Sequence, residues 1–514
     1  MRPFTLLLLV TSTNRLGAIA KGGTSVTDSE LGSSCCSELH KELPSLVHYP
    51  SSSEYESRNA EYYSKQQQEL HPTCILRPKV TDDVSRILQI ANSLQCPFAV
   101  ASGGHMCWKG SSNIDGGFLI DLRSMNKISI QHERQIVELG PGATWINVYA
   151  ALEPHSISTA GGRISGVGVG GFLLGGGIAF ASAEKGLGAN NVINYEVVLS
   201  NGTIVNANET ENEDLFWAMK LPSTNYGIVT RFDMRTYPSS AIWGAVNVYP
   251  FTPTLASELY AQSEKWGHDD TNRDNMVSIA MMRNKGMSLA LAVQVNEAGI
   301  AHDPLTSDTP IMHLETTGST YKVVREVVDS ALAATTRTRW HTITTKIDTE
   351  YFMDIFEKSE SIMKPHDDRE NILWSIAVQH FQKSCINAAK ESPIFNALGQ
   401  GKDDLVNIHI RMEWANHDDD AALEEAAYEL GTLAETEARK RSILNNFIYL
   451  NYADGNQPVY ERSVTPGDME KMREIKKAYD PAGIFDRLWR GGYKLPVERA
   501  NMSQADADNK HDEL

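Results

Sequence analysis

The chain has 514 residues, 41% of them hydrophobic and 22% charged, a composition typical of a globular protein with room for two or three domains. Its formal net charge of −18 at pH 7 repels phosphate backbones and acidic lipid surfaces, which argues against nucleic acid as a partner and against binding to anionic membranes. No stretch approaches the length of a membrane-spanning helix.

The two ends of the chain carry targeting signals. Residues 1–20 combine a basic start, an apolar run over residues 4–10 and a final small-residue site, which predicts a secretory signal peptide. The polar tail over residues 497–514 is expected to be flexible, and it ends in His-Asp-Glu-Leu, the signal that an endoplasmic-reticulum retrieval receptor binds. Together these signals predict a protein of the endoplasmic-reticulum lumen.

That compartment is oxidising, so the six cysteines are able to pair, and the sequence leaves their connectivity open. Sequons for N-glycosylation begin at Asn201, Asn208 and Asn501, all in polar stretches. The sequence contains neither an H-x-x-x-H pattern nor a pair of C-x-x-C motifs, so we predict no metal site.

The first core elements form a strand–helix–strand unit. Residues 21–50 are polar and are expected to have little regular structure, whereas residues 53–70 are expected to form a helix. A strand over residues 74–78 ends at a proline, and residues 81–91 place apolar side chains at helical spacing. A second strand over residues 97–100 completes a βαβ opening, in which ligands bind where the strands end.

A turn of small residues follows the second strand and delivers a histidine. Ser102, Gly103 and Gly104 allow positive φ angles and a close approach of the backbone to a ligand. Consecutive N–H groups in such a turn bind anions, so a diphosphate fits here with His105 at the rim. On this segment alone, an ordinary structural turn is the alternative.

The densest glycine run covers residues 158–177. Residues 166–171 match the G-x-G-x-x-G pattern, but no apolar strand leads into them and more glycines follow, which argues against a nicotinamide dinucleotide site. A flexible linker is disfavoured because the run has no proline and is poor in the serine and charge that linkers carry. The interleaved Val and Phe favour a backbone that lies flat against a broad planar ligand.

The remaining chain alternates between predicted strands and helices, and their pattern changes near residue 240. Before it we expect a hairpin at 128–139, a helix at 145–152, strands at 194–199, 203–207 and 226–232, and a helix at 214–218. Beyond it we expect strands at 246–248, 277–282, 288–294, 374–380 and 406–414, and helices at 257–267, 322–333 and 420–438. This order predicts an α+β protein whose second domain is an antiparallel sheet with helices on one face, supplying a substrate pocket.

Six motifs now support a resemblance: Arg77-Pro78, Ser102-Gly103-Gly104-His105, the glycine run over 161–177, Tyr226-Gly-Ile-Val-Thr230, Tyr449-Leu-Asn451-Tyr452, and Tyr479-Asp480-Pro481 with Phe485. Their order and context resemble those of the berberine-bridge-enzyme-like flavoproteins, part of the vanillyl-alcohol-oxidase / p-cresol methylhydroxylase superfamily. The resemblance covers about residues 55–496.

The resemblance implies a three-part organisation around FAD. A FAD-binding domain of the p-cresol methylhydroxylase type with two small subdomains covers residues 68–239, a substrate domain covers 240–445, and residues 446–496 return to the flavin. It also implies that His105 carries FAD covalently through the 8α-methyl group of the flavin ring. The implied cofactor contacts are Ser102, Gly103, Gly104, Gly161, Gly168, Gly171, Gly177, Ile228 and Tyr452.

This chain departs from the family pattern in two places that concern the cofactor. Many relatives carry a second tether from a cysteine just before V-G-x-G-G, but Ile164 occupies that position, which predicts a single covalent bond and a milder oxidant. Residues 221–226 lack the glycines usual in relatives, so the cofactor contacts there are expected to differ. The family's N-terminal disulfide maps onto Cys36, or its neighbour Cys35, with Cys96; we assign it to Cys36 and Cys96.

The expected reaction is the oxidation of an alcohol, an amine or an activated C–H group of a small molecule, with transfer of hydride to the flavin and O2 as the final acceptor. Tyr449 is the candidate base or orienting residue, on one face with Asn451, and a packed structural tyrosine is the alternative. A phenol acts as a base near neutrality only if its pKa is lowered from about 10. His409, Arg411 and Glu413 share a strand face that points to the pocket or to solvent.

Other activities stay open at this point. A non-redox cyclase or isomerase on a flavoprotein scaffold, a carbohydrate oxidase and a luminal binding protein are the alternatives, whereas a serine hydrolase lacks its G-x-S-x-G elbow. Retrieval to the endoplasmic reticulum beside an oxidase fold favours the tailoring of specialised metabolites.

Overall fold

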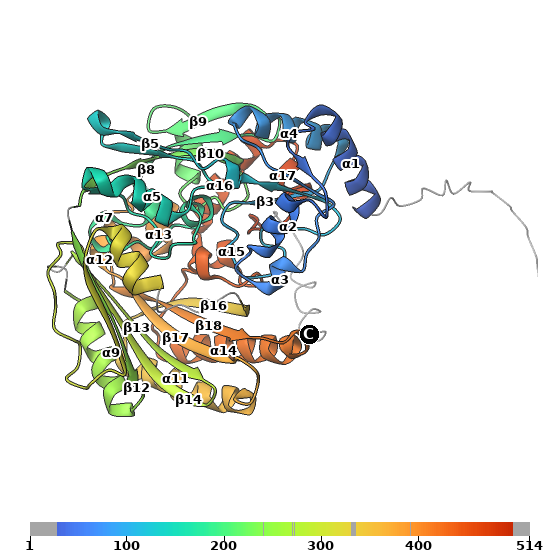
Figure 1. Cartoon of the computed structure of the whole chain (residues 1–514). Coiled ribbons are helices and arrows are strands. Elements are labelled where there is room, and N and C mark those ends of the chain that lie inside the picture. Colours follow the sequence, from blue (N-terminus) through green and yellow to red (C-terminus); the bar gives the residue numbers. More distant parts are fainter. Residues whose placement is uncertain are drawn as a thin grey trace, which may run out of the picture.

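The structure is a computed structural model that describes residues 28–239, 241–269, 271, 273–329, 336–390 and 392–496. The predicted signal peptide, the sequon at Asn501 and the C-terminal His-Asp-Glu-Leu lie outside these residues. The described chain forms two parts that face each other (Figure 1). The upper part in Figure 1 contains residues up to about 240 together with the C-terminal segment, and the lower part is built on one large sheet.

The first sheet contains the predicted strand–helix–strand unit. Its strands are β1 (Val47–His48), β2 (Cys74–Leu76), β3 (Phe98–Ala101) and β4 (Phe118–Asp121), in the order β1-β2-β4-β3. Both β2 and β3 pair with β4 in parallel, so their carboxyl ends lie at one edge of the sheet. Helix α4 (Thr81–Leu94) packs its buried face, with Val84, Ile87, Leu88 and Ala91, against these strands. The predicted βαβ opening is therefore confirmed.

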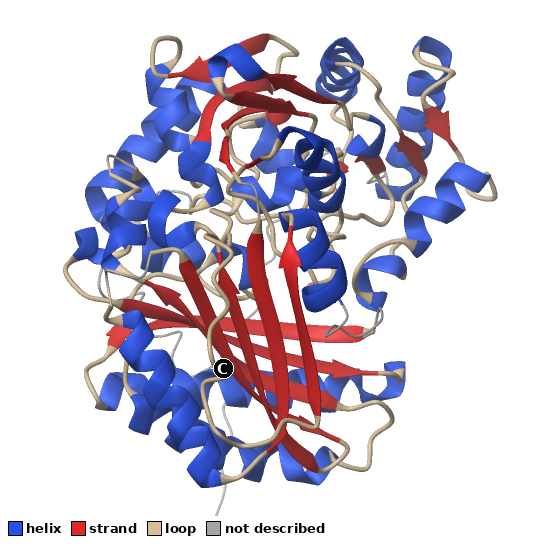
Figure 2. Ribbon diagram, turned by 60° about the vertical axis from the view of Figure 1, so that its left-hand side comes forward, coloured by secondary structure: helices blue, strands red, loops and turns tan. Residues whose placement is uncertain are grey.

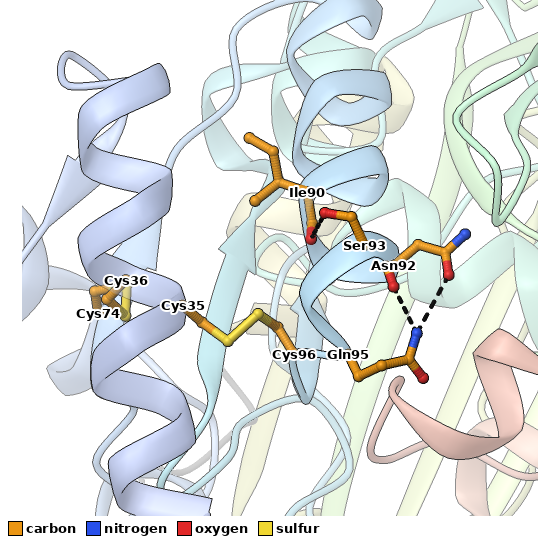
Figure 3. Close-up of a disulfide and its surroundings, with 8 residues drawn as sticks. All are labelled: Cys35, Cys36, Cys74, Ile90, Asn92, Ser93, Gln95 and Cys96. Atoms are coloured by element: carbon orange, nitrogen blue, oxygen red, sulfur yellow. Dashed lines mark hydrogen bonds between the residues drawn. A yellow bond between two sulfur atoms is a disulfide. The ribbon is translucent and has the colours of Figure 1, made fainter.

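The segment before this sheet is helical, and our expectation of little regular structure was wrong there. Helix α1 (Asp28–Glu42) carries Cys35 and Cys36 on its buried side. Cys35 is bonded to Cys96 at the end of α4, and Cys36 is bonded to Cys74 in β2 (Figure 3). The predicted Cys36–Cys96 pairing is thus corrected. Neighbouring residues of a helix project about 100° apart, so the two sulfur atoms reach different elements.

The two disulfides indicate an oxidising compartment on the secretory pathway. Cys107 and Cys385 are free and buried. No helix in the described part of the chain is long and apolar enough to cross a membrane.

The predicted helix over residues 53–70 is two short helices, α2 (Ser53–Ala60) and α3 (Lys65–Gln68). The break lies at residues 61–64, where Ser64 starts α3 and its hydroxyl accepts a hydrogen bond from the N–H of Gln67. Local capping therefore overrides the helical composition of this stretch. The break also leaves Tyr63 outside both helices.

The second sheet completes the upper part. Its order is β5-β6-β10-β8-β9, and every pairing is antiparallel. The core beneath it joins the helices α5, α6 and α8 with the C-terminal segment. Bounds are β5 (Ile128–Gln131), β6 (Ile136–Leu139), β8 (Val192–Val198), β9 (Ile204–Asn208), β10 (Ile228–Arg235), α5 (Trp145–Leu152), α6 (Val169–Leu174), α7 (Ser182–Lys185) and α8 (Glu213–Ala218), with β7 (Ile157–Ser158) paired to β11 (Tyr237–Pro238).

The lower part is an eight-stranded antiparallel sheet in the order β15-β12-β14-β13-β17-β18-β16-β19. Three long helices, α9 (Pro253–Gly267), α11 (Thr349–Met363) and α14 (Asp420–Lys440), cover one face, as Figures 1 and 2 show. The expected sheet with helices on one face is confirmed. Its strands are β12 (Ile242–Pro250), β13 (Asn275–Asn284), β14 (Met287–Asn296), β15 (Met312–Gly318), β16 (Arg337–Lys346), β17 (Leu373–Phe381), β18 (Leu405–Trp414) and β19 (Leu444–Asn445).

The sequence did not reveal β15 and β16, and the helix expected at 322–333 is one turn of α10 (Thr320–Val323) followed by a π-helical turn over Val324–Val328. The other face of the sheet turns toward the upper part. The C-terminal segment crosses back to the first sheet, where the N–H of Arg490 donates to the carbonyl of Phe98 at 2.7 Å. The remaining helices are α12 (Lys383–Asn387), α13 (Pro393–Ala397), α15 (Val459–Ser463), α16 (Pro466–Tyr479) and α17 (Ile484–Arg487).

Candidate active site

A cavity of about 220 Å³ lies between the upper part and the large sheet. Four segments form its wall: the turn that follows β3, the glycine run, the segment at 449–452, and Trp340 of β16. These segments are far apart in the sequence, and each was singled out above except the one that holds Trp340. The C-terminal residues Trp489 and Tyr493 close the far end.

The turn after β3 and the glycine run touch each other through their backbones. A Cβ atom on Gly103 would lie 2.5 Å from the nitrogen of Gly168, and a Cβ atom on Gly168 would lie 2.4 Å from the nitrogen of Gly103, so neither position accepts a side chain. Ser102 fixes the turn by donating its hydroxyl to the carbonyl of Pro141 at 2.6 Å. Within the described residues, the N–H groups of Gly103, Gly104 and His105 donate to no protein acceptor. The residues present therefore fit the diphosphate of a dinucleotide, as expected for such a nest.

A buried positive charge lies directly beneath this turn. The guanidinium group of Arg58 is fully buried, its centre lies 4.0 Å from the ring centroid of Tyr62, and it would be 2.6 Å from a Cβ atom on Gly104. Its closest carboxylate is Asp121, at 3.9 Å, and none of its nitrogen atoms has a hydrogen-bond partner among the described residues. This charge adds to the affinity of the turn for an anion.

His105 lies at the cavity wall with its ring stacked on Tyr63, at 4.1 Å between centroids and an interplanar angle of 19°. Burial, and secondarily the nearby Arg411, lower the pKa of His105 to about 4. The imidazole is therefore neutral at neutral pH and keeps a lone pair for bond formation. The ring is held in one orientation, because Tyr63 and Trp340 flank it.

The glycine run supplies the flat part of the wall. Gly168 and Gly171 line the cavity, and nothing lies within 4 Å of a Cβ atom built on Gly171. Gly161 and Gly177 do not line it, and their role as cofactor contacts stays a prediction. Gly161 packs on the ring of Trp145, and Gly177 has a φ angle of +80° beside Phe172, so both serve the fold.

Tyr449 and Asn451 meet in the cavity, and Leu450–Tyr452 form a 3-10 turn. The Nδ2 group of Asn451 donates to the hydroxyl of Tyr449 at 3.1 Å, and the N–H of Ile178 donates to the same oxygen at 2.8 Å. Burial raises the pKa of Tyr449 above its ordinary value, against smaller opposing effects of the hydrogen bonds from Asn451 and Ile178 and of Arg163. The phenol thus stays protonated near neutrality and retains its own proton for donation.

Tyr452 lies where the cavity wall meets the large sheet. Its ring stacks on His409 at 4.1 Å and meets Tyr449 edge-on at 4.9 Å, and its hydroxyl accepts a hydrogen bond from Arg163 at 2.9 Å. His409 itself does not line the cavity, and its Nε2 atom is buried without a partner in the described part of the chain. Burial, with Arg411 and Arg163, lowers the pKa of His409 to about 3.

Arg411 and Glu413 form an ion pair behind this aromatic layer, and the hydroxyl of Tyr63 lies 3.5 Å from the carboxylate of Glu413. They do not line the cavity. The strand face that these two residues share with His409 therefore supports the aromatic wall rather than forming the pocket.

The rest of the lining is mostly apolar and includes Ile228 of β10 and Ile164. Trp340, Tyr63 and Tyr493 lie outside every motif that the sequence indicates. The β-branched, alternating sequence Arg337–Lys346 carries a strand signal that would have placed Trp340.

Comparison with known proteins agrees with this geometry. Residues 72–208 match the model of a FAD binding domain family. A FAD-dependent monooxygenase of Aspergillus calidoustus is 32% identical over 491 residues, covering 90% of this chain and 90% of the relative. Another, from Cochliobolus heterostrophus, is 29% identical over 465 residues, covering 87% of this chain and 89% of the relative.

Solved structures share the fold. Berberine bridge enzyme from Eschscholzia californica superposes with a TM-score of 0.71 at 16% identity, covering 91% of this chain and 99% of that chain. The berberine-bridge-enzyme-like protein 1 of Physcomitrella patens superposes with a TM-score of 0.72 at 17% identity, covering 91% and 99%. With the relative at 32% identity over nine tenths of the chain, these findings show that the chain is an enzyme of the FAD-linked oxidoreductase family, with the fold of the berberine-bridge-enzyme-like flavoproteins.

Proposed function

We propose that this enzyme oxidises an alcohol, an amine or an activated C–H group of a small organic molecule, with O2 as the electron acceptor. The observation that carries the proposal is one cavity that joins an anion-binding turn, a neutral histidine and an aromatic wall. FAD, when bound, would supply the two-electron oxidising power for this reaction. Residues 102–105 and 168–171 would hold it, and Tyr452 and Trp340 would face the substrate.

We further propose that FAD is attached through a single covalent bond to His105. The neutral imidazole and its fixed stacking on Tyr63 suit a nucleophile, and Ile164 in place of a cysteine offers no second one. The test is the absorption spectrum of acid-precipitated, washed protein. Yellow colour should stay in the wild-type pellet and be lost in His105→Ala, while Cys107→Ser should keep it. A colourless wild-type pellet would refute the tether.

We assign Tyr449 the role of orienting the reacting group by donating its hydroxyl proton. The hydroxyl already accepts hydrogen bonds from Asn451 and Ile178, so its proton is the part left to point into the cavity. Asn451 is bound to the carbonyl of Phe172 at 3.0 Å and so holds Tyr449 in place. The raised pKa of Tyr449 argues against its alternative role as a base near neutrality.

The redox chemistry is tested by mixing the purified enzyme, without oxygen, with a panel of phenols, alcohols and amines. Bleaching of the flavin by a substrate, followed by return of the colour and peroxide formation when air is admitted, would support an oxidase. Conversion of a substrate with the flavin unbleached throughout would instead support the non-redox cyclase or isomerase. The apolar, aromatic cavity gives the carbohydrate oxidase less support.

Monooxygenation is a second candidate, because the relatives from Aspergillus calidoustus and Cochliobolus heterostrophus are described as monooxygenases. Turnover under ¹⁸O2 separates the two: label in the organic product supports a monooxygenase, and label only in peroxide supports an oxidase. We place the enzyme in the endoplasmic-reticulum lumen, glycosylated and retained by the retrieval receptor, in the tailoring of specialised metabolites. Secretion of a chain that lacks residues 511–514 would support that location.

A further inference from the structure

Arg163 belongs to the glycine run and reaches across the cavity toward the large sheet. Its Nη2 atom donates to the amide oxygen of Gln379 at 2.6 Å and to the hydroxyl of Tyr452 at 2.9 Å. Both partners are neutral. The Nε and Nη1 atoms donate to no acceptor in the described residues, yet protein atoms do not seal them off. They are therefore available to a ligand.

The position of Arg163 also favours contact with a ligand. Arg163 and Gln379 both line a smaller cavity next to the main one, so the guanidinium group lies where the two meet. The backbone nearby is held from the large-sheet side, because the N–H of Ser165 donates to Asp329 at 3.2 Å and its hydroxyl donates to the same carboxylate. Arg163 thus occupies a fixed place rather than a free loop.

Its charge is not balanced by the protein. No carboxylate of the described residues lies within 4.0 Å of Arg163, unlike Arg411, which is paired with Glu413. The cavity wall contains neither an aspartate, a glutamate nor a lysine among the residues described, and Arg163 is its single permanently charged side chain. A partly desolvated cation without a counter-ion is costly, and a bound anion lowers that cost.

We infer that the substrate binds as an oxyanion on a flat organic framework, and that Arg163 recognises this oxyanion. The inference rests on the proposed function, since it names the substrate class of the same site. The cavity supplies the aromatic surface through Trp340 and Tyr452, and Arg163 supplies the charge-assisted hydrogen bonds at one end. A phenolate, an enolate or an aromatic carboxylate shares this chemistry.

Because the described wall contains no carboxylate, a substrate that binds already ionised would not need a protein base to remove its proton. Within the described lining, the groups able to take a proton are His105, which the flavin tether would occupy, and tyrosines such as Tyr449, whose pKa is raised. An oxyanion has already released its proton to solvent on binding, so no protein base has to remove it at that position. Arg163 would therefore set which substrates bind and in which ionisation state.

The test uses flavin-loaded enzyme and probes that it cannot oxidise. The Kd values of 4-nitrophenol, 4-nitrobenzoate and the neutral 4-nitroanisole are measured from the change in the flavin spectrum, and the absorbance of bound 4-nitrophenol shows whether it is phenol or phenolate. We expect the anions to bind about tenfold to a hundredfold more tightly than 4-nitroanisole. The phenolate and carboxylate arms tell which oxyanion is preferred.

Variants then locate the effect. The preference for the anions should be lost in Arg163→Met and Arg163→Gln, and partly kept in Arg163→Lys. Arg235→Met, which removes an exposed arginine outside the cavity, should bind all three probes as the wild type does. If the Met and Gln variants do not load flavin, the wild type still decides: 4-nitrophenol should bind more tightly at a pH above its own pKa than below it.

Equal affinity for 4-nitroanisole and the anions, or an anion preference that persists in Arg163→Met, would overturn the inference. These readouts are separate from turnover. Anion preference in a protein that oxidises no substrate would refute the proposed oxidase and leave Arg163 as the anion site. Oxidation of a neutral substrate with unchanged kcat and KM in Arg163→Met would refute the inference and leave the oxidase.

Discussion

The side chain of Tyr449 is buried, yet its hydroxyl group lies at the cavity and is able to donate a hydrogen bond there. We expect Tyr449→Phe to keep its flavin and to lower the rate of anaerobic flavin reduction, because one donor to the reacting group is lost. Removal of the hydroxyl also leaves the buried N–H of Ile178 without its acceptor, which should cost about 1 to 3 kcal/mol in urea unfolding.

The pH profile separates orientation from base catalysis at Tyr449. For an orienting phenol, the wild-type rate should show no ionisation of this group near neutrality, since its pKa is raised. A wild-type inflection between pH 6 and 8 that Tyr449→Phe abolishes would contradict the assignment and restore the base role.

The asparagines of two sequons differ in solvent exposure and in the hydrogen bonds of their side chains. Asn201 is exposed and uses only its amide oxygen, which accepts from the N–H of Thr203 at 2.9 Å. Asn208 is half-buried, and its Nδ2 group, the atom that a glycan would modify, donates to Asn194 at 3.0 Å. We expect glycopeptide mass spectrometry of protein from a secretory host to find a glycan on Asn201 and an unmodified Asn208. Full occupancy of Asn208 would contradict this prediction.

At the residue scale, the sequence predicted those site residues that belong to local motifs. His105, Gly103 and Gly104 could be predicted because a short stretch determines the turn in which they lie. Trp340 and Tyr63 could not, since their place in the site depends on how the large sheet docks against the upper part. Composition alone does not separate the glycines that line the cavity, such as Gly168, from Gly161 and Gly177, which lie against aromatic rings of the protein itself.

At the scale of elements, helix α1 is attached by two covalent bonds to two different elements. We expect the double variants Cys35→Ser/Cys96→Ser and Cys36→Ser/Cys74→Ser each to lose about 2 to 4 kcal/mol in urea unfolding, because each bond closes a long loop in the unfolded chain. Free-thiol labelling tests the connectivity itself: Cys35→Ser should expose Cys96, and Cys36→Ser should expose Cys74. Release of Cys96 by Cys36→Ser would restore the pairing first expected from the sequence.

Strand β16 is fastened to the N-terminal segment by a buried arginine. Arg337 is 3% exposed and pairs with Glu69 beyond α3 and with Asp420 at the start of α14. We expect Arg337→Met to lower the free energy of unfolding by about 1 to 3 kcal/mol. The loss is smaller than for a fully buried ion pair, because the two carboxylates are partly exposed to solvent. The change should also loosen the contact that holds Trp340 at the cavity and raise KM. Arg86→Met, which removes an exposed surface pair, is the control and should leave both quantities unchanged.

The elements that the sequence predicted well are those with a strong period of their own, such as α5 and α14. The exposed strand β15 alternates between exposed and half-buried residues and carries little apolar signal, which is why it was missed. Helix α1 was not predicted because its sequence is polar. The disulfides attach it to the rest of the fold, and local helix propensity does not reflect them.

At the scale of the whole molecule, buried neutral histidines govern the response to acid. The pKa values of His341 and His380 are lowered to about 4 and that of His409 to about 3, mainly by burial. Below pH 6.5 the unfolded chain therefore binds protons that the folded chain does not bind until about pH 4. Stability should fall as the pH drops through this window, by up to about 1.4 kcal/mol per pH unit for each histidine.

Glu297 acts in the opposite direction, because burial raises its pKa to about 7 and the folded state holds its proton. It contributes stability that is fully present below pH 4.5 and is lost as the pH rises through 7, so it offsets one of the three histidines. Urea unfolding at pH 7 and pH 5 tests the balance. His341→Gln should lose less stability between these two values than the wild type does, and an unchanged difference would contradict the prediction.

The C-terminal segment completes a cavity whose first wall lies in the N-terminal half of the chain, which is made earlier. Tyr449 and Tyr493 line the same cavity as the turn after β3, and the hydroxyl of Tyr493 accepts a hydrogen bond from Trp108 at 3.1 Å. A ribosome releases the turn with His105 several hundred residues before it releases these partners. Because the cavity wall is complete only once these residues have been made, we expect the flavin to be bound after synthesis of the chain has finished.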